Sequence, residues 1–328
     1  MARYRAAVIG LGRIGWAMEA DERRPKPATH VGAWLACPRT ELVAVCDADA
    51  KRIGFASRLG FLGLVSSDAS EMLAAPNIES VSVATPAETH RAIVAPCAAA
   101  GVTAIVCEKP LAPTSADCRA MIAACVASGS RLFVNHSRRF DPLLRAAAAE
   151  VPEQLGEIVQ VVGHYSGGLW NSGVHMVDLI RMLCGEVAWA LGEWCRPFDN
   201  APDPGYNATL QLEHGERVTL LAHDVRDYAI FDLHVYGRRG ALHMTDSSFT
   251  VAWESTEDHA EFSGYRRLSS PLYVAGGESR SFMAPMAEHV CDVLDGVAEP
   301  VSTGEDGLMA VRVLEAIQST GHGSSKHV

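Results

Sequence analysis

The sequence has no apolar stretch long enough to cross a bilayer, and its N-terminus has no signal-peptide pattern. Its longest apolar runs, such as residues 95–106, are broken by glycine, proline or cysteine. A membrane-spanning helix needs about 20 consecutive apolar residues. A secretory leader would place basic residues before an apolar core and a small-residue cleavage site. We therefore expect a cytoplasmic protein with no membrane partner.

The cysteines and histidines lack the spacings that bind metal ions. The nine cysteines include no CxxC pair, and none lies with histidine at the spacing of a zinc site. An odd number of cysteines also argues against a complete disulfide framework. We expect reduced cysteines that behave as small buried hydrophobes, and no metal site.

Basic charge is scarce as well. Lysine and arginine total 28 against 39 aspartates and glutamates, which gives a formal net charge of -11. Such a charge repels a nucleic-acid backbone and an anionic membrane surface, and it favours solubility. It excludes nucleic acid as the main partner. What the chain does have is 48% hydrophobic residues over a length of 328, enough for the cores of two domains.

The first part of the chain alternates short β-branched runs with helical stretches, as the βαβ units of a parallel sheet do. Strands are predicted at residues 6–9, 42–46, 81–84, 104–107 and 132–134. Helices are predicted between them at residues 50–59, 89–100 and 115–128, and Gly101 and Gly129 follow two of the helix ends. The pattern predicts an α/β fold with a doubly wound parallel sheet in a first domain, residues 1–135.

A different order of elements follows. A helix, a strand and a helix are predicted at residues 143–150, 158–165 and 173–183. Five strands with short turns come next, as in an antiparallel sheet, at residues 208–212, 217–222, 230–236, 241–245 and 249–254. Two helices near residues 285–296 and 307–319 close the chain. The pattern predicts a second, α+β domain at residues 136–320 and a flexible tail at residues 321–328.

A glycine-rich turn, Gly10-Leu11-Gly12-Arg13-Ile14-Gly15, follows the first predicted strand directly, and Asp47 stands at the end of the second. In a dinucleotide-binding unit, such glycines let the backbone approach a pyrophosphate at a helix N-terminus, and the acidic residue accepts from the adenosine ribose 2′-hydroxyl. Asp47 repels a 2′-phosphate, so NAD is favoured as cofactor. Lys51 and Arg52 nearby leave NADP possible.

Open α/β sheets bind ligands at the carboxyl ends of their strands. Thr85-Pro86, Glu108-Lys109-Pro110 and Asn135-His136 follow three of the predicted strands. A lysine in this position can contact both a nicotinamide and a substrate hydroxyl, although an isolated surface lysine is usually only solvated. Lys109 is therefore the first catalytic candidate.

A second group of polar residues lies within residues 167–180. On a helix that begins near Ser172, His175 and Asp178 are three residues apart and share a face. A neutral histidine can take up a proton near neutral pH, and a carboxylate can hold its tautomer. The alternative is a partly buried histidine that Asp178 merely satisfies.

The glycine turn, Glu-Lys-Pro, Asn-His-x-Arg-Arg-Phe-Asp and Gly-Gly-x-x-Asn-x-Gly-x-His-x-x-Asp, in this order, resemble the Gfo/Idh/MocA family of glucose-fructose oxidoreductase and inositol dehydrogenase. The resemblance spans nearly the whole chain. It implies a Rossmann domain, and a second domain with a large, open, mostly antiparallel sheet that covers the nicotinamide and often forms the oligomer interface. It also implies Lys109 as the catalytic lysine, His175 as the general acid or base, and a homodimer or homotetramer.

The chain departs from that family at Asn171, where many members carry an aspartate four residues before the histidine. Asparagine can hydrogen-bond a substrate but cannot accept a proton as a carboxylate does. We therefore expect Lys109 and His175 to handle the proton between them. The loop at residues 20–29 is expected to border the substrate mouth, with a plain surface loop as the alternative.

These observations predict an NAD(P)-dependent oxidoreductase that interconverts a secondary alcohol and a ketone on a sugar, amino sugar, nucleotide-linked sugar or cyclitol. The alternatives are an epimerase, lyase or glycosidase that retains NAD without net redox change, and a cofactor-sensing protein without activity. The expected substrate-binding residues are Asn171, Asp178, Tyr165, Arg139 and Trp170, with Tyr165 as a reserve proton donor. For Arg139 and Trp170, a surface salt bridge and a core position are the alternatives. The expected cofactor-binding residues are Gly10, Gly12, Arg13, Ile14, Gly15, Asp47, Thr85, Pro86, His90, Glu108, Lys109 and Asn135.

Overall fold

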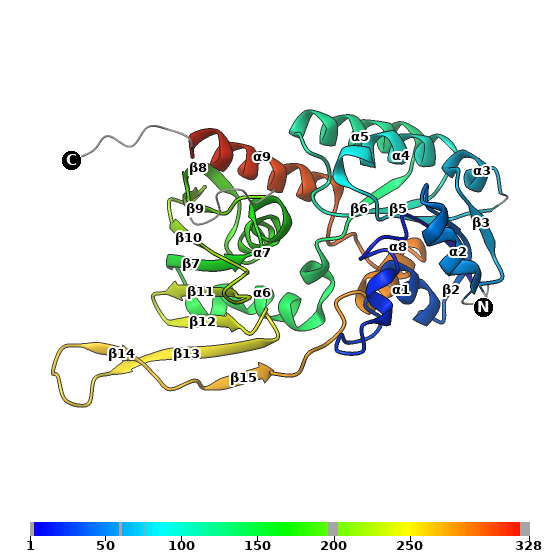
Figure 1. Cartoon of the computed structure of the whole chain (residues 1–328). Coiled ribbons are helices and arrows are strands. Elements are labelled where there is room, and N and C mark those ends of the chain that lie inside the picture. The colour runs from blue at the N-terminus through cyan, green and yellow to red at the C-terminus, as the bar shows by residue number, and fades with distance from the viewer. Residues whose placement is uncertain (1–2, 59–60, 76, 196–202, 322–328) are drawn as a thin grey trace. The chain divides into compact units, whose positions relative to one another are not determined.

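The computed structural model describes residues 3–58, 61–75, 77–195 and 203–321, and the chain divides into two compact units (Figure 1). The first unit comprises Met1–Asp141 and Arg280–Val311, and the second comprises Pro142–Ser279 and Arg312–Val328. The sequence pattern assigned residues 280–311 to the second domain, whereas in the structure they pack with the first. Of the predicted tail, residues 322–328 lie outside the described residues.

The first unit is built on a six-stranded parallel sheet with the order β3-β2-β1-β4-β5-β6. Its strands are β1 (Tyr4–Ile9), β2 (Thr40–Cys46), β3 (Leu64–Ser66), β4 (Ser80–Val83), β5 (Ala104–Cys107) and β6 (Arg131–Val134). The order reverses between β1 and β4, which makes the carboxyl ends of these two strands the topological switch point of a doubly wound fold. The predicted parallel sheet is confirmed. The short edge strand β3 was not predicted.

Helices cover both faces of this sheet, with α4 and α5 on one side and α1 and α8 on the other (Figure 1). The helices of the first unit are α1 (His30–Ala36), α2 (Ala50–Arg58), α3 (Ala69–Leu73), α4 (Ala87–Ala99), α5 (Ser115–Ser128) and α8 (Ala284–Leu294), with short helices η1 (Ala17–Ala20) and η2 (Ser137–Phe140). Val8 and Phe133 of the sheet, Trp34 of α1 and Val290 of α8 belong to one buried apolar cluster. That shared core explains why residues 280–311 belong to the first unit, since burying apolar surface is the main favourable term in folding.

The second unit is built on a nine-stranded, mostly antiparallel sheet with the order β14-β13-β12-β11-β7-β10-β9-β8, in which β15 also pairs with β13. Only β7 and β10 pair in parallel. Its strands are β7 (Ile158–Ser166), β8 (Val187–Trp194), β9 (Tyr206–Leu212), β10 (Arg217–His223), β11 (Phe231–Gly237), β12 (Gly240–Thr245), β13 (Thr250–Asp258), β14 (Arg266–Leu268) and β15 (Tyr273–Gly276). The predicted open antiparallel sheet is confirmed, and β8, β14 and β15 are additional strands.

Two helices of the second unit, α6 (Pro142–Leu155) and α7 (Val174–Cys184), pack against this sheet. Of α9 (Gly304–Thr320), the residues up to Val311 belong to the first unit and those from Arg312 to the second. A single π-helical turn, η3 (Leu169–Gly173), leads into α7. Side chains alternate along the strands, so Val161 and Leu233 are fully buried whereas His164 and His234 are only half-buried. No helix in the described ranges is long and apolar enough to span a membrane.

Candidate functional site

The carboxyl ends of the parallel strands lie in register at one edge of the first sheet. Ile9 pairs with both Cys46 and Val83, and Cys107 pairs with both Val83 and Val134. The residues that follow these strand ends are therefore brought to one edge, namely the glycine turn, Asp47, Thr85, Glu108, Lys109 and Asn135. This is the edge at which open α/β sheets bind their ligands.

The glycines of the turn are required by its close packing. Gly10 has a φ of +96°, and a Cβ there would lie 2.6 Å from the carbonyl carbon of Ala84. A Cβ on Gly15 would overlap the carbonyl oxygen of Gly10. At Gly12, by contrast, the nearest atom to an added Cβ is Nη1 of Arg52, at 3.7 Å. The first and third glycines thus hold the turn, while the second leaves its backbone open to the approach of a ligand.

The helix expected directly after the turn is interrupted. One helical turn forms, in which the Trp16 N–H donates to the Gly12 carbonyl at 3.0 Å. The α-helix itself begins only at His30, where the His30 N–H donates to the Ile14 carbonyl at 3.0 Å. Residues 16–29 therefore stand as an insertion at the start of the helix that usually follows such a turn.

The inserted loop is tied back to its own base. The Glu19 carboxylate accepts from the Ala28 N–H at 2.9 Å and from the Thr29 hydroxyl at 2.6 Å. Thr29 in turn caps α1, because its Oγ1 accepts from the Gly32 N–H at 3.1 Å. That the loop borders the substrate mouth stays a prediction.

Asp47 is 7% exposed and joins β2 to the glycine turn. Its Oδ2 accepts from the Leu11 N–H at 2.7 Å and from Arg52 Nη1 at 3.2 Å, and its Oδ1 accepts from the Asp49 N–H at 2.8 Å. A carboxylate offers about four acceptor positions, so one remains for a further donor such as a ribose hydroxyl.

His90, which was predicted to bind the cofactor, contacts two backbone carbonyls. The ring is fully buried, with Nε2 at 2.9 Å from the Thr85 carbonyl and Nδ1 at 3.0 Å from the Leu111 carbonyl. His90 thus ties the loop after β4 to the loop after β5, which carries Lys109.

Glu108 turns inward from the end of β5, whereas Lys109 beside it is half-buried. Glu108 Oε1 accepts from Asn135 Nδ2 at 2.6 Å and lies 2.9 Å from His30 Nε2. Burial alone would raise the pKa of the Glu108 carboxyl. The hydrogen bond and charge of His30, the charge of Lys109 and the hydrogen bond of Asn135 outweigh that effect and lower the pKa to about 2. Glu108 is therefore an ionised, buried carboxylate held by protein donors.

The polar residues of the second unit gather on η3 and the first turns of α7. Asp203 caps the η3 turn, because its carboxylate accepts from the Trp170 N–H at 3.0 Å and from the Asn171 N–H at 2.7 Å. The Asn171 side chain donates from Nδ2 to the Gly167 carbonyl at 3.2 Å. Sequence reasoning missed Asp203, since nothing along the chain links it to a turn 32 residues earlier.

His175 is half-buried in the first turn of α7, and Asp178 lies one turn later with 2% of its surface exposed. Asp178 Oδ1 lies 3.5 Å from Arg181 Nη1. Arg181 also donates from Nε and Nη2 to Glu186, at 2.8 and 2.7 Å. The predicted spacing of His175 and Asp178 on one helix is confirmed, and Asp178 belongs to a buried ion-pair group with Arg181.

Three predicted substrate ligands have partners within the protein. Tyr165 is fully buried, and its hydroxyl donates to the Tyr206 carbonyl at 2.7 Å and accepts from the Tyr206 N–H at 3.0 Å. Burial raises the pKa of this phenol, so a reserve proton donor is not what the structure provides. Arg139 lies 3.0 Å from Asp306, and Trp170 Nε1 donates to Gln318 at 3.3 Å; substrate binding by these two residues stays a prediction.

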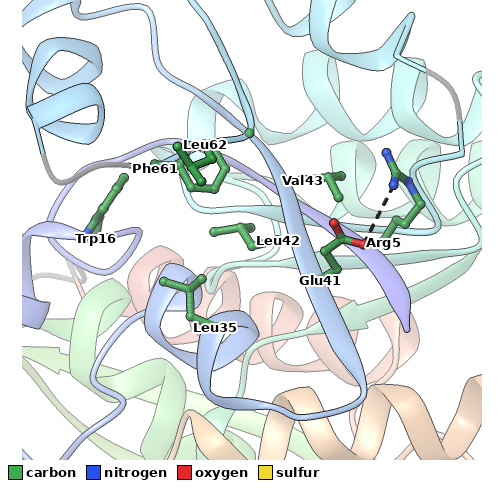
Figure 2. A pocket seen from close by; sticks show the side chains of 9 residues that line it. Arg5, Trp16, Leu35, Glu41, Leu42, Val43, Phe61 and Leu62 are labelled. Carbon is green, nitrogen blue, oxygen red and sulfur yellow. Dashed lines mark ion pairs between the residues drawn. The ribbon is translucent and has the colours of Figure 1, made fainter. Parts of the chain in front are cut away.

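A hollow of about 540 Å³ opens elsewhere on the first unit (Figure 2). Trp16, Leu35, Phe61 and Leu62 line its apolar side, and the Arg5–Glu41 ion pair, at 3.9 Å, lines the other. Arg5 and Glu41 stand near the amino ends of β1 and β2, so this side of the hollow is away from the strand ends, whereas Trp16 on its apolar side directly follows the glycine turn. Within the described residues, no group of three or more His, Cys, Asp or Glu side chains could hold a metal ion.

Comparison with known proteins agrees with this architecture. A family model described as "Oxidoreductase family, NAD-binding Rossmann fold" matches residues 4–136. A second, described as "Oxidoreductase family, C-terminal alpha/beta domain", matches residues 158–325. The first unit is thus an NAD-binding Rossmann domain.

Similar proteins include two sugar or cyclitol dehydrogenases. The chain is 31% identical over 236 residues to a D-apiose dehydrogenase of Paraburkholderia graminis, a match that spans 66% of this chain and 59% of that protein. It is 26% identical over 340 residues to inositol 2-dehydrogenase 2 of Paenarthrobacter aurescens, across 97% of this chain and 96% of that protein. Among solved structures, the WlbA dehydrogenase of Bordetella pertussis in complex with NADH and UDP-GlcNAcA has a TM-score of 0.78 at 22% identity, over 97% of this chain and 96% of that one. That likeness shows the shared fold.

Proposed function

Because this chain belongs to the Gfo/Idh/MocA oxidoreductase family, we propose that it interconverts a secondary alcohol and a ketone on a sugar, amino sugar, nucleotide-linked sugar or cyclitol. The observation that carries the proposal is the register of the first sheet, in which Cys107 pairs with Val83 and Val83 with Ile9. This register brings Lys109 to the same sheet edge as the glycine turn. A proton-transferring side chain and a dinucleotide-binding turn at one edge are what a hydride-transfer enzyme requires.

NAD is the favoured cofactor, and the glycine turn and Asp47 are the residues that would hold it. The opening above Gly12 admits a pyrophosphate, and the remaining acceptor position of Asp47 suits a ribose hydroxyl. When bound, the nicotinamide supplies the hydride acceptor or donor. Side chains of the protein would bind and orient the substrate and transfer its proton.

The proton is assigned to Lys109 and His175. In the oxidation direction, the hydroxyl proton of the substrate would pass to Lys109 Nζ, with His175 sharing or relaying it; in reduction the same groups return it to the ketone oxygen. Asn171 would orient the substrate through its amide. Lys109 belongs to the first unit and His175 to the second.

The similar D-apiose and inositol dehydrogenases make polyols and sugars the first substrates to test. We further propose that the chain assembles as a homodimer or homotetramer, which light scattering coupled to size-exclusion chromatography would measure. A monomer over the whole accessible concentration range would contradict this.

The decisive experiment measures NADH formation, through absorbance near 340 nm, with NAD⁺ and a panel containing myo-inositol, D-apiose and UDP-linked amino sugars. The substrate found is then used with Lys109→Ala. This variant should keep NADH binding and lose at least about 100-fold in turnover, the usual contribution of a proton-transferring side chain. Arg119→Ala on the exposed surface of α5 is the matched control and should turn over normally.

Normal turnover by Lys109→Ala would overturn the assignment. Conversion of substrate without net NADH, followed by chromatography, would instead favour an epimerase, lyase or glycosidase that retains its cofactor.

A further inference from the structure

A line of buried polar groups ends at Glu108, the residue before Lys109. Trp34 Nε1 of α1 donates to Ser82 Oγ of β4 at 2.8 Å, and Ser82 Oγ lies 2.9 Å from Nδ1 of His30. His30 Nε2 then lies 2.9 Å from Oε1 of Glu108 at the end of β5. Trp34, Ser82 and His30 are fully buried, and Glu108 is 6% exposed. Burying four polar side chains in an apolar interior is costly unless each is hydrogen-bonded, so their arrangement calls for an explanation.

The hydrogen bonds of this line have a defined direction. Trp34 has only a donor, so Ser82 Oγ accepts from it. Glu108 is ionised and has only acceptors, so His30 Nε2 carries the proton between them. Ser82 Oγ, 2.9 Å from His30 Nδ1, holds the other side of the ring. Trp34 Nε1 and His30 Nε2 therefore both donate toward the Glu108 end of the line.

The carboxylate is also coupled to Lys109. Its Oε2 accepts from the Lys109 backbone N–H at 3.3 Å, and the Lys109 charge stabilises its ionised form. Two of its neighbours, Asn135 and Cys107, carry no charge. Asn135 of β6 is an amide, and burial raises the pKa of Cys107 well above its usual value, which keeps that thiol neutral. His30 and Lys109 are thus the titratable groups that stabilise the charge on Glu108.

We propose that Glu108 is the buried counter-ion of Lys109, and that His30 and Ser82 are positioning residues that keep this carboxylate ionised and directed at the strand end. The inference deepens the role proposed above for Lys109 and rests on it. A negative charge fixed on the residue next to the lysine favours the ammonium form of Lys109, so the resting enzyme holds the proton that reduction of a ketone consumes. In the opposite direction, the same charge favours uptake of the substrate's hydroxyl proton by Lys109.

The composition of the chain allows a direct test. It contains only four lysines, Lys26, Lys51, Lys109 and Lys326, so reductive methylation with ¹³C-formaldehyde gives few NMR signals. Dimethylation keeps the positive charge, and Lys109→Arg assigns the signal of interest. The titration curve of the Lys109 signal is then recorded in the wild type and in variants.

Glu108→Gln tests the counter-ion, because it removes the charge and keeps the shape. The midpoint of the Lys109 titration should move to lower pH, while that of Lys51 on α2 stays in place. An unmoved Lys109 midpoint in a folded Glu108→Gln variant would overturn the proposal.

His30→Leu and His30→Gln test the positioning residues as a pair. In the wild type, Glu108 is ionised throughout the neutral range, so Glu108 should contribute no inflection to the Lys109 signal between about pH 4 and pH 8. His175, which shares the proton of Lys109 in the proposed reaction, can contribute one, so each variant is compared with the wild-type curve. His30→Leu removes the donor to Glu108, and protonation of the buried carboxyl should then appear as an additional inflection in that range. His30→Gln can still donate, and it should restore the wild-type curve. Identical curves for His30→Leu and the wild type would overturn the role of His30.

Folding is checked by thermal melting and by NADH binding. If His30→Leu does not fold, Ser82→Ala replaces it, since this change removes the hydroxyl that holds the His30 ring. The Lys109 titration curve of Ser82→Ala should show the same additional inflection at lower pH. A curve identical to that of the wild type would count against the proposal. The titration needs no turnover, so it is independent of the Lys109→Ala assay. A moved midpoint together with normal turnover by Lys109→Ala would retain the counter-ion and remove the catalytic role. An unmoved midpoint in Glu108→Gln together with lost turnover by Lys109→Ala would retain the catalytic role of Lys109 and remove the counter-ion role of Glu108.

Discussion

Asp47 Oδ2 lies 2.7 Å from the backbone nitrogen of Leu11, so the carboxylate that ends β2 holds the glycine turn that follows β1. The two segments are 36 residues apart in the chain. One side chain thus combines two tasks, because it fixes the shape of the turn and keeps a negative charge where the adenosine ribose of a dinucleotide would bind.

Asp47→Asn should therefore change cofactor preference. The amide retains a carbonyl acceptor for Leu11 but loses the charge that repels a 2′-phosphate, and Arg52 at 3.2 Å is released from its ion pair. We expect NADH to bind about 10-fold more weakly, as for the loss of one hydrogen bond to a charged group, and NADPH to bind more tightly. Titrations of nucleotide fluorescence with both cofactors give the ratio, each serving as control for the other. An unchanged ratio would contradict the role given to Asp47.

Tyr165→Phe separates a structural from a catalytic tyrosine. The buried hydroxyl bonds both the N–H and the carbonyl of Tyr206, and its loss leaves those backbone groups without this partner. We expect the free energy of unfolding to fall by about 1–3 kcal/mol, with kcat and KM near wild type. Urea unfolding and initial rates measure both. Lost turnover at unchanged stability would restore Tyr165 as a substrate ligand.

Asp203→Ala tests the cap on the turn that precedes α7. Trp170 and Asn171 would lose the acceptor of their N–H groups. The expected results are a loss of about 1 kcal/mol in unfolding free energy, as for other caps, a reduced kcat and unchanged NADH affinity. Asp203→Asn keeps one acceptor and should lie between Ala and wild type. Equal kcat for all three proteins would show that the turn does not position Asn171 or His175.

Most of the first sheet could be predicted from sequence because its strands of four or more residues contain apolar runs, most of which are followed within three residues by glycine, proline or an acidic residue. Two features could not. The strand β3 has three residues, too few to show a period, and it pairs with only Ala44, Val45 and Cys46 of β2. The helix expected after Gly15 is displaced to His30, since a loop tied by Glu19 interrupts it and no local pattern distinguishes an insertion from a helix start.

The strand-end residues could be predicted for the same reason as the strands, because in-register parallel strands bring their carboxyl ends to one edge. The line from Trp34 to Glu108 could not. It joins residues 48 and 78 positions apart, and a histidine or serine in an apolar run carries no sign of its partner. Tyr165 illustrates the converse, since a tyrosine was expected as a reserve proton donor and only the structure shows that its buried hydroxyl bonds the backbone of Tyr206.

A row of histidines lies across the half-buried face of the second sheet. His164 Nδ1 of β7 lies 3.0 Å from His223 Nε2 of β10, and His234 Nδ1 of β11 lies 2.7 Å from His243 Nδ1 of β12. Glu254 of β13 ends the row, with Oε2 at 3.2 Å from His243 Nε2. In each histidine pair, one ring nitrogen donates its hydrogen and the other ring nitrogen accepts it. A proton added to the accepting nitrogen therefore breaks the hydrogen bond of the pair.

This row should make the stability of the second unit depend on pH. Burial first, and then the charge of His223 for His164 and of His243 for His234, lowers the pKa of both rings below 6.5, against a smaller opposing effect of Asp232. The unfolded chain then binds more protons than the folded one as pH falls past about 6.5, so the free energy of unfolding should decrease on acidification from about pH 7.5 to pH 5.5. The ionised Glu108 carboxylate also stabilises the folded chain, and this contribution is lost on acidification only below its unfolded pKa of 4.5, which lies outside that window. The free energy of unfolding of the second unit is measured by urea unfolding at several pH values. Its dependence on pH should be weaker in the double variant His164→Gln/His234→Gln than in the wild type. Parallel profiles for the two proteins would show that these rings titrate alike in the folded and unfolded chain.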